Sequence, residues 1–295
     1  MLINQSNLSG LFKGFQTSFN KGKEQAPSYY KDIAMIVSSQ SREETYAWLG
    51  QFPKLREWLG DRVIKNLSAN GYTLKNKLFE DSISVPRTDI EDDNYGVFGP
   101  LFAEMGRVSM EHPDELVFNL LAAGFATVCY DGQYFFDTDH PVNGASVSNM
   151  QSGANPAWFL MDTSRSIKPL LFQERAPYEL TSLTNATDEN VFMRDEYLYG
   201  VRGRANAGFG LWQLAFGSKA ALDATNYASA RSAMMSFKGD EGRPLGIKPD
   251  TLVVPPALES AALELIKNEL IINGSISTSN QWAGTAKLIV CPWLA

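Results

Sequence analysis

A stretch of alternating side chains at residues 71–95 constrains the fold most, because it predicts a long two-stranded β-ribbon. Residues 72–79 alternate with the period of two that is typical of a strand. The acidic and polar residues 80–82 predict a turn, after which Ile83 and Val85 resume the alternation. An isolated hairpin is only marginally stable in water, so we expect this ribbon to lie on another subunit.

Composition and charge describe an ordinary globular chain rather than a nucleic-acid-binding protein. The 295 residues are 44% hydrophobic, which is enough to bury the core of one or two domains. The formal net charge is -7, from 33 acidic and 26 basic residues. Proteins that grip phosphates carry a basic face, so this balance argues against a tight nucleic-acid ligand.

The cysteines and the start of the chain bear on its compartment. Cys129 and Cys291 are too few for a disulfide framework, which favours a reducing compartment. Residues 1–19 lack the apolar core and cleavage pattern of a signal peptide. No window approaches the roughly 20 apolar residues of a membrane span. We therefore expect synthesis in the cytoplasm and no membrane partner.

The first 28 residues predict an arm in which large apolar residues are scattered among polar ones. Two interpretations stay open: a short helix that lies on a partner, or a frayed terminus. Beyond the arm, Ser41 and Glu44 form a capping-box pattern, which predicts a helix through Leu49.

A longer helix is predicted at residues 97–124, because its apolar residues fall at spacings of three and four. The residues expected in its core are Phe98, Leu101, Phe102 and Met105. Pro113 interrupts or kinks this helix, which makes it a candidate hinge.

The second half of the chain mixes strands and helices, which indicates an α+β fold. Residues 158–216 predict several strands separated by Pro, Asn, Asp and Gly. Amphipathic patterns predict helices at 226–237 and 257–270, and short strands are predicted at 251–254 and 287–290.

One group of residues offers catalytic chemistry. Asp137, Asp139 and His140, in the sequence FDTDHP, match the ligand types of a metal-dependent hydrolase. Asp and Pro also form turns, because the Asp side chain bonds to nearby backbone, and we favour that interpretation. The glycines at residues 200–210 fit no phosphate-binding pattern. We predict no catalytic residue, no metal ion and no cofactor.

Six segments, in their order along the chain, resemble the major head subunit family of Mu-like bacteriophages, which has the Hong Kong 97 type of capsid fold. The segments are IAMIVSSQSREETYAWLGQFPKLREWLGDR, NGYTLKNKLFEDSISVPRTDIEDDNYGVFGPLFAEMGR, PDELVFNLLAAGF, YDGQYFFDTDHPV, WFLMDTSRSIKPLLFQERAPYEL and IKPDTLVVPPALESAALELI. The resemblance covers nearly the whole chain.

The resemblance implies an α+β capsid fold of four parts. These are an N-terminal arm at 1–28, a peripheral-type domain at 29–66 and 97–215 with its spine helix at 97–124, an extended loop at 67–96, and an axial-type domain at 216–295. The residues expected to contact a neighbouring subunit through the extended loop are Tyr72, Leu74, Lys75, Lys77, Phe79, Ile83 and Val85. In many relatives, a segment like the one that starts at Trp158 follows the helix that lies here at 257–270, which implies a permuted segment order.

The resemblance also implies partners. The subunit would associate with itself as hexamers and pentamers that close into an icosahedral shell around double-stranded DNA. A scaffold and protease, a portal and decoration proteins would be further partners, and the location would be the virion. The negative charge suits weak, non-specific contact with packaged DNA. The alternatives are another virion subunit, of a tail or an adhesin, and the hydrolase that uses Asp137, Asp139 and His140.

Overall fold

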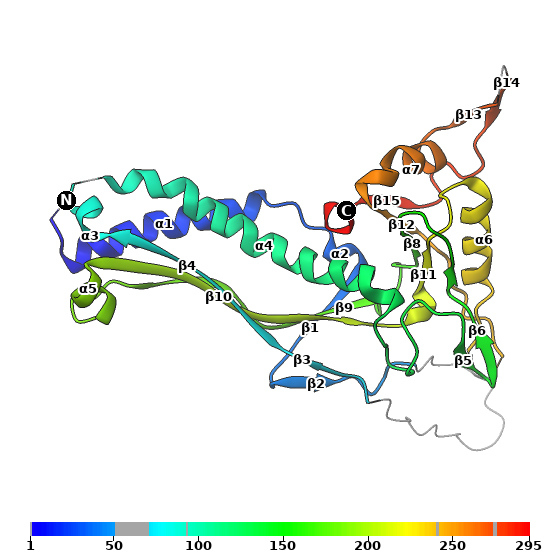
Figure 1. The fold of residues 1–295 in the computed structure, drawn as a ribbon, viewed down its shortest axis with the longest axis horizontal. Coiled ribbons are helices and arrows are strands. Elements are labelled where there is room, and N and C mark those ends of the chain that lie inside the picture. The colour runs from blue at the N-terminus through cyan, green and yellow to red at the C-terminus, as the bar shows by residue number, and fades with distance from the viewer. Residues whose placement is uncertain (1, 51–70, 93, 240–241, 274–275) are drawn as a thin grey trace.

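The computed structural model describes residues 2–50, 71–92, 94–239, 242–273 and 276–295. Figure 1 shows an elongated lobe that is joined at one end to a compact lobe. The N-terminus lies at the far end of the elongated lobe, and the C-terminus lies near the junction between the lobes. Residues 51–66 of the expected peripheral-type domain, and residues 67–70 and 93 of the expected extended loop, lie outside the described residues.

A four-stranded sheet runs along the elongated lobe in the order β1-β9-β10-β4. Its strands are β1 (Ala34–Ser38), β9 (Leu170–Leu183), β10 (Glu196–Phe209) and β4 (Lys77–Pro86). Strand β1 is parallel to β9, whereas β9, β10 and β4 are antiparallel neighbours. Two further short strands, β2 (Glu43–Thr45) and β3 (Thr73–Lys75), pair with each other.

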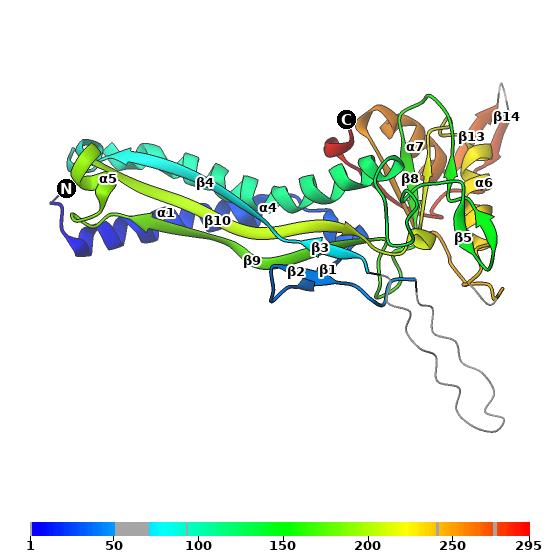
Figure 2. The ribbon, with the colours of Figure 1, turned by 60° about the horizontal axis from the view of Figure 1, so that its bottom comes forward.

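Two long helices, α1 (Gln5–Gln25) and α4 (Gly99–Ala122), follow this sheet in both views (Figures 1 and 2). Helix α4 is the predicted long helix, and Pro113 lies inside it without ending it. Helix α1 begins at Asn4, whose side chain accepts a hydrogen bond from the Asn7 N–H at 2.8 Å. The buried residues of α1 recur every three or four positions and are Leu8, Leu11, Phe15, Phe19 and Gly22.

The N-terminal segment is therefore neither a frayed terminus nor a short helix. It forms 21 residues of helix whose apolar face packs on its own subunit. Sequence periodicity was obscured because Gly and Ser occupy α1 positions that face open space, such as Gly10 and Gly14.

The predicted two-stranded ribbon is wrong, because residues 80–82 do not form a turn. They lie in the middle of β4, which runs without interruption from Lys77 to Pro86. Its partner is β10, a strand more than a hundred residues later, with Val85 opposite Tyr197. Polar residues are tolerated at 80–82 because β4 is an edge strand of the sheet.

The predicted helix at 41–49 is also wrong, although part of its capping interaction forms. The Glu44 carboxylate accepts hydrogen bonds from the backbone N–H groups of Gln40 at 2.9 Å and Ser41 at 3.1 Å. These bonds close a tight loop, and the following residues pair as β2 with β3. Side chain to backbone bonds of this kind stabilise turns as well as helix starts.

The compact lobe is built on a five-stranded sheet in the order β15-β12-β8-β11-β7. Its strands are β7 (Met150–Gln151), β8 (Trp158–Met161), β11 (Ala215–Ser218), β12 (Thr251–Val254) and β15 (Lys287–Val290). Every residue of β8, β11 and β12 is buried. The strands predicted at 251–254 and 287–290 form at those residues. The helices predicted at 226–237 and 257–270 also form, with different bounds, as α6 (Ala224–Met235) and α7 (Glu259–Ile266).

Short elements complete the two lobes. The hairpins are β5 (His140–Val142) with β6 (Ala145–Val147) and β13 (Leu270–Asn273) with β14 (Ile276–Ser279). The short helices are α2 (Tyr30–Ile33), α3 (Arg87–Glu91) and α5 (Glu189–Arg194). Helix α5 joins β9 to β10 at the far end of the elongated lobe (Figure 2).

The buried residues form two cores. The larger core fills the compact lobe and the adjoining ends of α4 and the long strands. The smaller core lies between α1, α4 and the far ends of β4, β9 and β10. Because each lobe has its own buried cluster, α4 and the two long strands are the elements that connect them.

Candidate functional site

The apolar residues expected on the extended loop contact their own subunit. Leu74 and Val85 are buried, and Ile83 packs against the smaller core. The Phe79 ring lies 4.2 Å, centroid to centroid, from the imidazole of His112 on α4. The Tyr72 hydroxyl accepts a hydrogen bond from the Phe209 N–H at 2.9 Å.

The exposed members of this set are Lys75 and Lys77. Their side chains lie on the solvent side of β3 and of the edge strand β4. Contact with a neighbouring subunit is therefore available through the two lysines, whereas the apolar members of the set stabilise the subunit itself.

A buried polar network fixes β3 onto β9. Gln173 of β9 is fully buried, and its amide nitrogen donates to the Leu74 carbonyl at 3.1 Å and to Asn76 Oδ1 at 2.8 Å. The Tyr46 hydroxyl donates to Gln173 Oε1 at 2.7 Å, and Asn76 Nδ2 donates to Ser39 Oγ at 2.8 Å. This network was not predicted from the sequence, because a single Gln within an apolar strand is its only local signal.

The four residues predicted in the core of the long helix differ in how deeply they are buried. Phe102 and Met105 are buried in the smaller core, and Phe98 is partly buried beside it. Leu101 is 46% exposed, so it is not a core residue. Successive helix residues are about 100° apart, and the buried face that begins at Phe102 leaves Leu101 on the outer edge.

Two contacts hold α4 on either side of Pro113. The Tyr178 hydroxyl lies 2.6 Å from His112 Nδ1, which ties the helix to β9. The buried Asp114 carboxylate accepts hydrogen bonds from the backbone N–H groups of Tyr29, at 2.9 and 3.1 Å, and of Tyr30. Burial raises the pKa of Asp114 to about 6, although these two hydrogen bonds act in the opposite direction.

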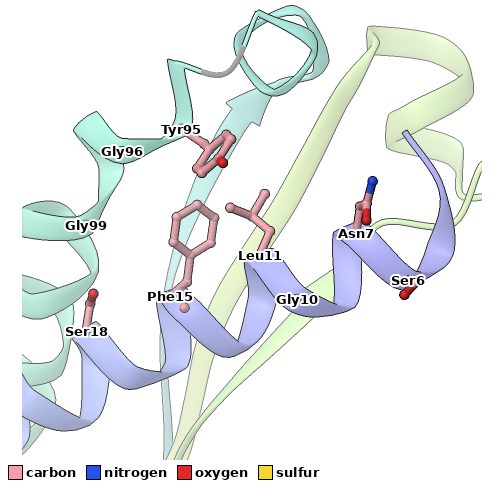
Figure 3. Close-up of a pocket in the computed structure, with 10 residues that line it drawn as sticks. Ser6, Asn7, Gly10, Leu11, Phe15, Ser18, Tyr95, Gly96 and Gly99 are labelled. Carbon is pink, nitrogen blue, oxygen red and sulfur yellow. The ribbon is translucent and has the colours of Figure 1, made fainter. Parts of the chain in front are cut away.

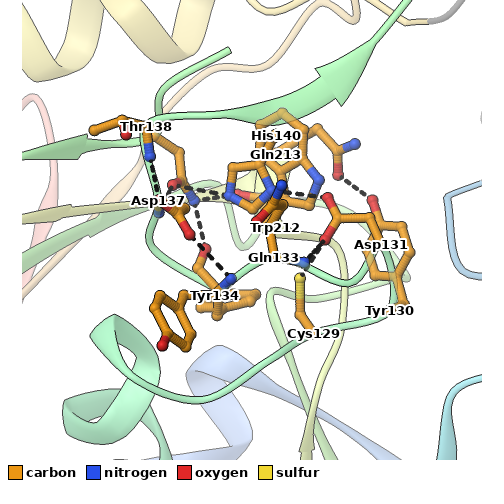
Figure 4. Close-up of polar contacts among 12 residues, drawn as sticks. Cys129, Tyr130, Asp131, Gln133, Tyr134, Asp137, Thr138, His140, Trp212 and Gln213 are labelled. Atoms are coloured by element: carbon orange, nitrogen blue, oxygen red, sulfur yellow. Dashed lines mark hydrogen bonds and ion pairs between the residues drawn. The ribbon is translucent and has the colours of Figure 1, made fainter. Parts of the chain in front are cut away.

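The residues of the hydrolase alternative, Asp137, Asp139 and His140, lie in a turn rather than in a cleft. Asp137 accepts hydrogen bonds from the N–H groups of Tyr134 at 3.1 Å and Thr138 at 2.8 Å (Figure 4). Asp139 is exposed, whereas His140 is fully buried. The His140 ring is stacked on Trp212 with 4.0 Å between ring centroids. These contacts match the turn interpretation.

The acid that His140 meets is Asp131. His140 Nδ1 lies 2.8 Å from Asp131 Oδ2, and the Cys129 thiol donates to Asp131 Oδ1 at 3.0 Å. Burial raises the pKa of Cys129, so its thiol stays protonated in this arrangement. Burial alone would raise the pKa of Asp131, but the hydrogen bonds from His140 and Cys129 lower it below its usual value.

A groove of about 520 Å³ lies between α1 and the segment before α4 (Figure 3). One wall is formed by α1 residues that include Gly10, Leu11 and Phe15, and the other includes Tyr95 and Gly99. Gly10 and Gly14 leave this groove open, because neither has a side chain to fill it and a Cβ on either would meet no atom within 4 Å.

Exposed apolar side chains gather on elements at the far end of the elongated lobe. Phe192 and Met193 of α5 are 81% and 70% exposed. Val97, which precedes α4, is 62% exposed, and Leu2 is 83% exposed. We call these four residues the tip surface. Contiguous exposed apolar patches mark interaction sites, so we treat these four residues as candidates for a subunit contact. This surface was not predicted from the sequence, because the residues around α5 lie between two predicted strands and have the composition of a connection.

No helix within the described part of the chain is long and apolar enough to cross a membrane.

Comparison with known proteins gives full-length matches. The family model described as Mu-like prophage major head subunit gpT matches residues 8–294. The major capsid protein of Escherichia phage Mu is 42% identical over 305 residues, which cover all of both chains. The Mu-like prophage FluMu major head subunit of Haemophilus influenzae is 45% identical and covers 97% of each chain.

The solved structures agree with the family match. A subunit from the procapsid of bacteriophage JBD30 superimposes with a TM-score of 0.85 at 48% identity, and 99% of this chain and 100% of that chain are covered. A subunit of the bacteriophage JBD30 capsid superimposes with a TM-score of 0.81 at 37% identity, with both chains fully covered. Both relatives are subunits of assembled shells, which shows that self-association is a property of this kind of chain.

These matches leave the hydrolase alternative without support and confirm the capsid fold and the virion as the location. The chain belongs to the family of Mu-like prophage major head subunits, and it is a structural capsid protein rather than an enzyme.

Proposed function

We propose that this subunit forms hexamers and pentamers, which close into an icosahedral phage head around double-stranded DNA. The observation that carries the proposal is the superposition of the whole chain on a procapsid subunit with a TM-score of 0.85. A shell needs each subunit to make several interfaces, and an interface of standard size buries about 1,600 Å². The elongated lobe supplies the surface for such contacts far from the compact lobe (Figure 1).

The tip surface is the part of the elongated lobe that supports a subunit contact most directly. Phe192 and Met193 are held outward on a short helix that ends at Asp195, a residue in the left-handed conformation with φ of 53°. Burying both side chains against a neighbouring subunit would contribute about 1.5–3 kcal/mol for each. Lys75 and Lys77 would make a second, polar contact from the sheet edge.

The further partners follow the same proposal. A scaffold with its protease and a portal would act during assembly, and a decoration protein would bind the finished shell. The capsid of bacteriophage JBD30 is decorated with minor capsid protein trimers, which supports the last of these. The net charge of -7 would let packaged DNA move along the inner wall with weak, non-specific contacts.

The domain division proposed for this subunit follows its two sheets. The peripheral-type domain would contain α1, α4 and the four-stranded sheet. The axial-type domain would contain the five-stranded sheet, which includes β7 and β8 from before residue 215.

Pro113 would act as the hinge between the two domains, because it cannot donate the helical hydrogen bond that other residues supply. Hydrogen exchange would test the hinge: protection across residues 109–117 that is equal in precursor and expanded shells would contradict it.

The assembly proposal is tested by negative-stain microscopy and sedimentation of the chain, expressed alone and with its scaffold. Closed shells, or hexamer and pentamer rings, are expected. A chain that remains monomeric or dimeric under both conditions would overturn the proposal, and tubes would favour a tail subunit instead.

The contribution of the tip surface is tested with a double substitution, Phe192→Ser with Met193→Ser. The expected variant unfolds at the same temperature as the unmodified chain, because both side chains are exposed, yet it yields few closed shells. The matched control is Met235→Ser on α6, where 51% of the residue is exposed. Normal shell yields from the double variant would exclude the tip surface as a necessary contact.

A further inference from the structure

Three side chains with metal-ligating atoms converge in the segment that follows α4 and ends at the start of β5. One ligand atom from each of Cys129, Asp131 and His140 lies within 4.8 Å of the other two. The side chains of His140 and Asp131 are 0% and 10% exposed, and Cys129 is 5% exposed. A tight turn brings Cys129 and Asp131 together, because Gly132 adopts φ of 89° and its N–H donates a hydrogen bond to the Cys129 carbonyl.

The hydrogen bonds of Asn149 determine which nitrogen of His140 carries a proton. Asn149 Nδ2 donates to the Phe135 carbonyl at 2.8 Å, and Asn149 Oδ1 accepts from the Asp137 N–H at 2.9 Å. The atom that faces His140 Nε2, at 3.2 Å, is therefore the acceptor Oδ1. Nε2 must be the donor in this contact, so Nε2 carries a hydrogen.

The opposite nitrogen of the ring faces a carboxylate. His140 Nδ1 lies 2.8 Å from Asp131 Oδ2, and two lone pairs cannot face each other at that distance. A proton must lie between the two atoms at this distance, and a bound metal ion would replace that proton and move the two atoms apart by a few tenths of an ångström. The second carboxylate oxygen, Oδ1, is held separately by the Gln133 N–H at 3.1 Å.

These contacts have the arrangement that surrounds metal ligands in proteins. A ligating His donates its other ring N–H to an oxygen acceptor, and a ligating carboxylate is held by a further hydrogen bond. Asn149 and Gln133 supply these two supports. Trp212, stacked on the His140 ring, fixes the plane of the imidazole and keeps water from it.

We propose that Cys129 Sγ, Asp131 Oδ2 and His140 Nδ1 bind a divalent metal ion, and that this ion is Zn²⁺. A thiolate, an imidazole and a carboxylate together are a typical zinc ligand set. Binding would replace two protons with the ion: one leaves the Cys129 thiol and one leaves the position between Nδ1 and Oδ2, and both go to solvent. The charge of the cluster is unchanged, because Zn²⁺ with two anionic ligands replaces a thiol and an imidazolium–carboxylate pair.

The role of the ion would be structural. All three ligands lie within residues 129–140, which connect α4 to the hairpin of β5 and β6. Zinc would therefore fasten the connection between α4 and β5, in which these three side chains lie close together (Figure 4). His140 is fully buried, so a substrate cannot reach the ion, which agrees with a family of structural subunits.

The test uses the full chain after dialysis against a chelator. Zinc is added, excess is removed, and bound metal is measured by elemental mass spectrometry, with Co²⁺ as a spectroscopic substitute for Zn²⁺. The unmodified chain is expected to bind one Zn²⁺ per subunit, to unfold at a higher temperature with zinc, and to show a sulfur-to-cobalt charge-transfer band. Cys129→Ser should lower the affinity at least tenfold and remove that band.

The matched control is Cys291→Ser, which removes the other buried thiol, outside the cluster, and should leave zinc binding unchanged. If Cys129→Ser does not fold, the cobalt spectrum of the unmodified chain decides alone. A chain that binds neither metal, and whose His140 shows both ring nitrogens protonated in nitrogen NMR spectra, would overturn the proposal.

Discussion

Gly22 of α1 lies against the carbonyl oxygen of Ala103 in α4, so that a Cβ built on Gly22 would be 1.8 Å from that oxygen. A second contact lies one helical turn away, where the glycine belongs to α4 and the carbonyl to α1: a Cβ on Gly106 would be 2.0 Å from the carbonyl oxygen of Phe19. The two helix backbones therefore touch with no side chain between them at these points. This crossing holds α1 on α4 of the same subunit.

Substitution of Gly22 by Ala should destabilise the subunit by about 1–3 kcal/mol, because the added methyl group must separate two backbones. The measurement is urea unfolding of the dissociated subunit. Gly14→Ala is the matched control on the same helix, since its Cβ would meet no atom within 4 Å. That variant should gain about 0.5–1 kcal/mol from helix propensity. Equal effects of the two substitutions would show that the crossing does not form.

Tyr199→Phe should stabilise the subunit. The Tyr199 side chain is fully buried among Phe15, Phe102 and Phe12, and its hydroxyl has no hydrogen-bond partner among the described residues. An unsatisfied buried hydroxyl costs about 1–3 kcal/mol, which the substitution removes.

The control for this prediction is Tyr227→Phe, because the Tyr227 hydroxyl is bonded to Thr285 at 3.0 Å. Thermal unfolding should place the two variants on opposite sides of the unmodified chain. A lower unfolding temperature for Tyr199→Phe would mean that its hydroxyl is bonded after all.

Asp114 should make the subunit less stable as the pH rises from about 4 to about 7. Its pKa is about 6 in the folded state against an ordinary value of 3.8, so the folded state binds the proton more tightly. The stabilisation is complete below pH 3.8 and is lost as the pH rises through 6. At about 1.36 kcal/mol per pKa unit, the loss is about 3 kcal/mol.

Asp114→Asn should remove this pH dependence, because the amide stays neutral and still accepts a hydrogen bond from the backbone. The quantity to measure is the difference in unfolding free energy between variant and unmodified chain at several pH values. Asp139→Asn, which removes a carboxylate at an exposed position, is measured beside it as the control. A flat difference for Asp114→Asn would mean that the buried carboxylate is ionised at no cost.

Gln173→Leu should destabilise the subunit by at least about 2 kcal/mol. It leaves the Tyr46 hydroxyl, the Leu74 carbonyl and Asn76 Oδ1 without the bonds that Gln173 provides. Combining it with Tyr46→Phe should recover part of the loss, because one unsatisfied group disappears. Additive losses in a double-mutant cycle would show that Tyr46 and Gln173 do not interact.

The sequence determined the local periodicities and the family of this protein. The helix at 97–124 and the strands at 251–254 and 287–290 were predictable, because each pattern is carried by residues that are close in the chain. The six segments that resemble Mu-like head subunits were likewise legible without coordinates, and the full-length matches confirm them. His140 was singled out together with its sequence neighbours Asp137 and Asp139, but the acid that it contacts is Asp131.

Only the tertiary structure decided which partner each element takes. Residues 80–82 carry the composition of a turn, yet they continue a strand because β10 supplies a backbone to pair with. The Ser41 and Glu44 pattern forms its bonds in a loop, because pairing of β2 with β3 prevents a helix there. The apolar residues of α1 look scattered in the sequence, and they form a buried face only where α4 and the sheet pack against them. In each case the deciding contact comes from residues far away in the chain, and local patterns contain no information about such partners.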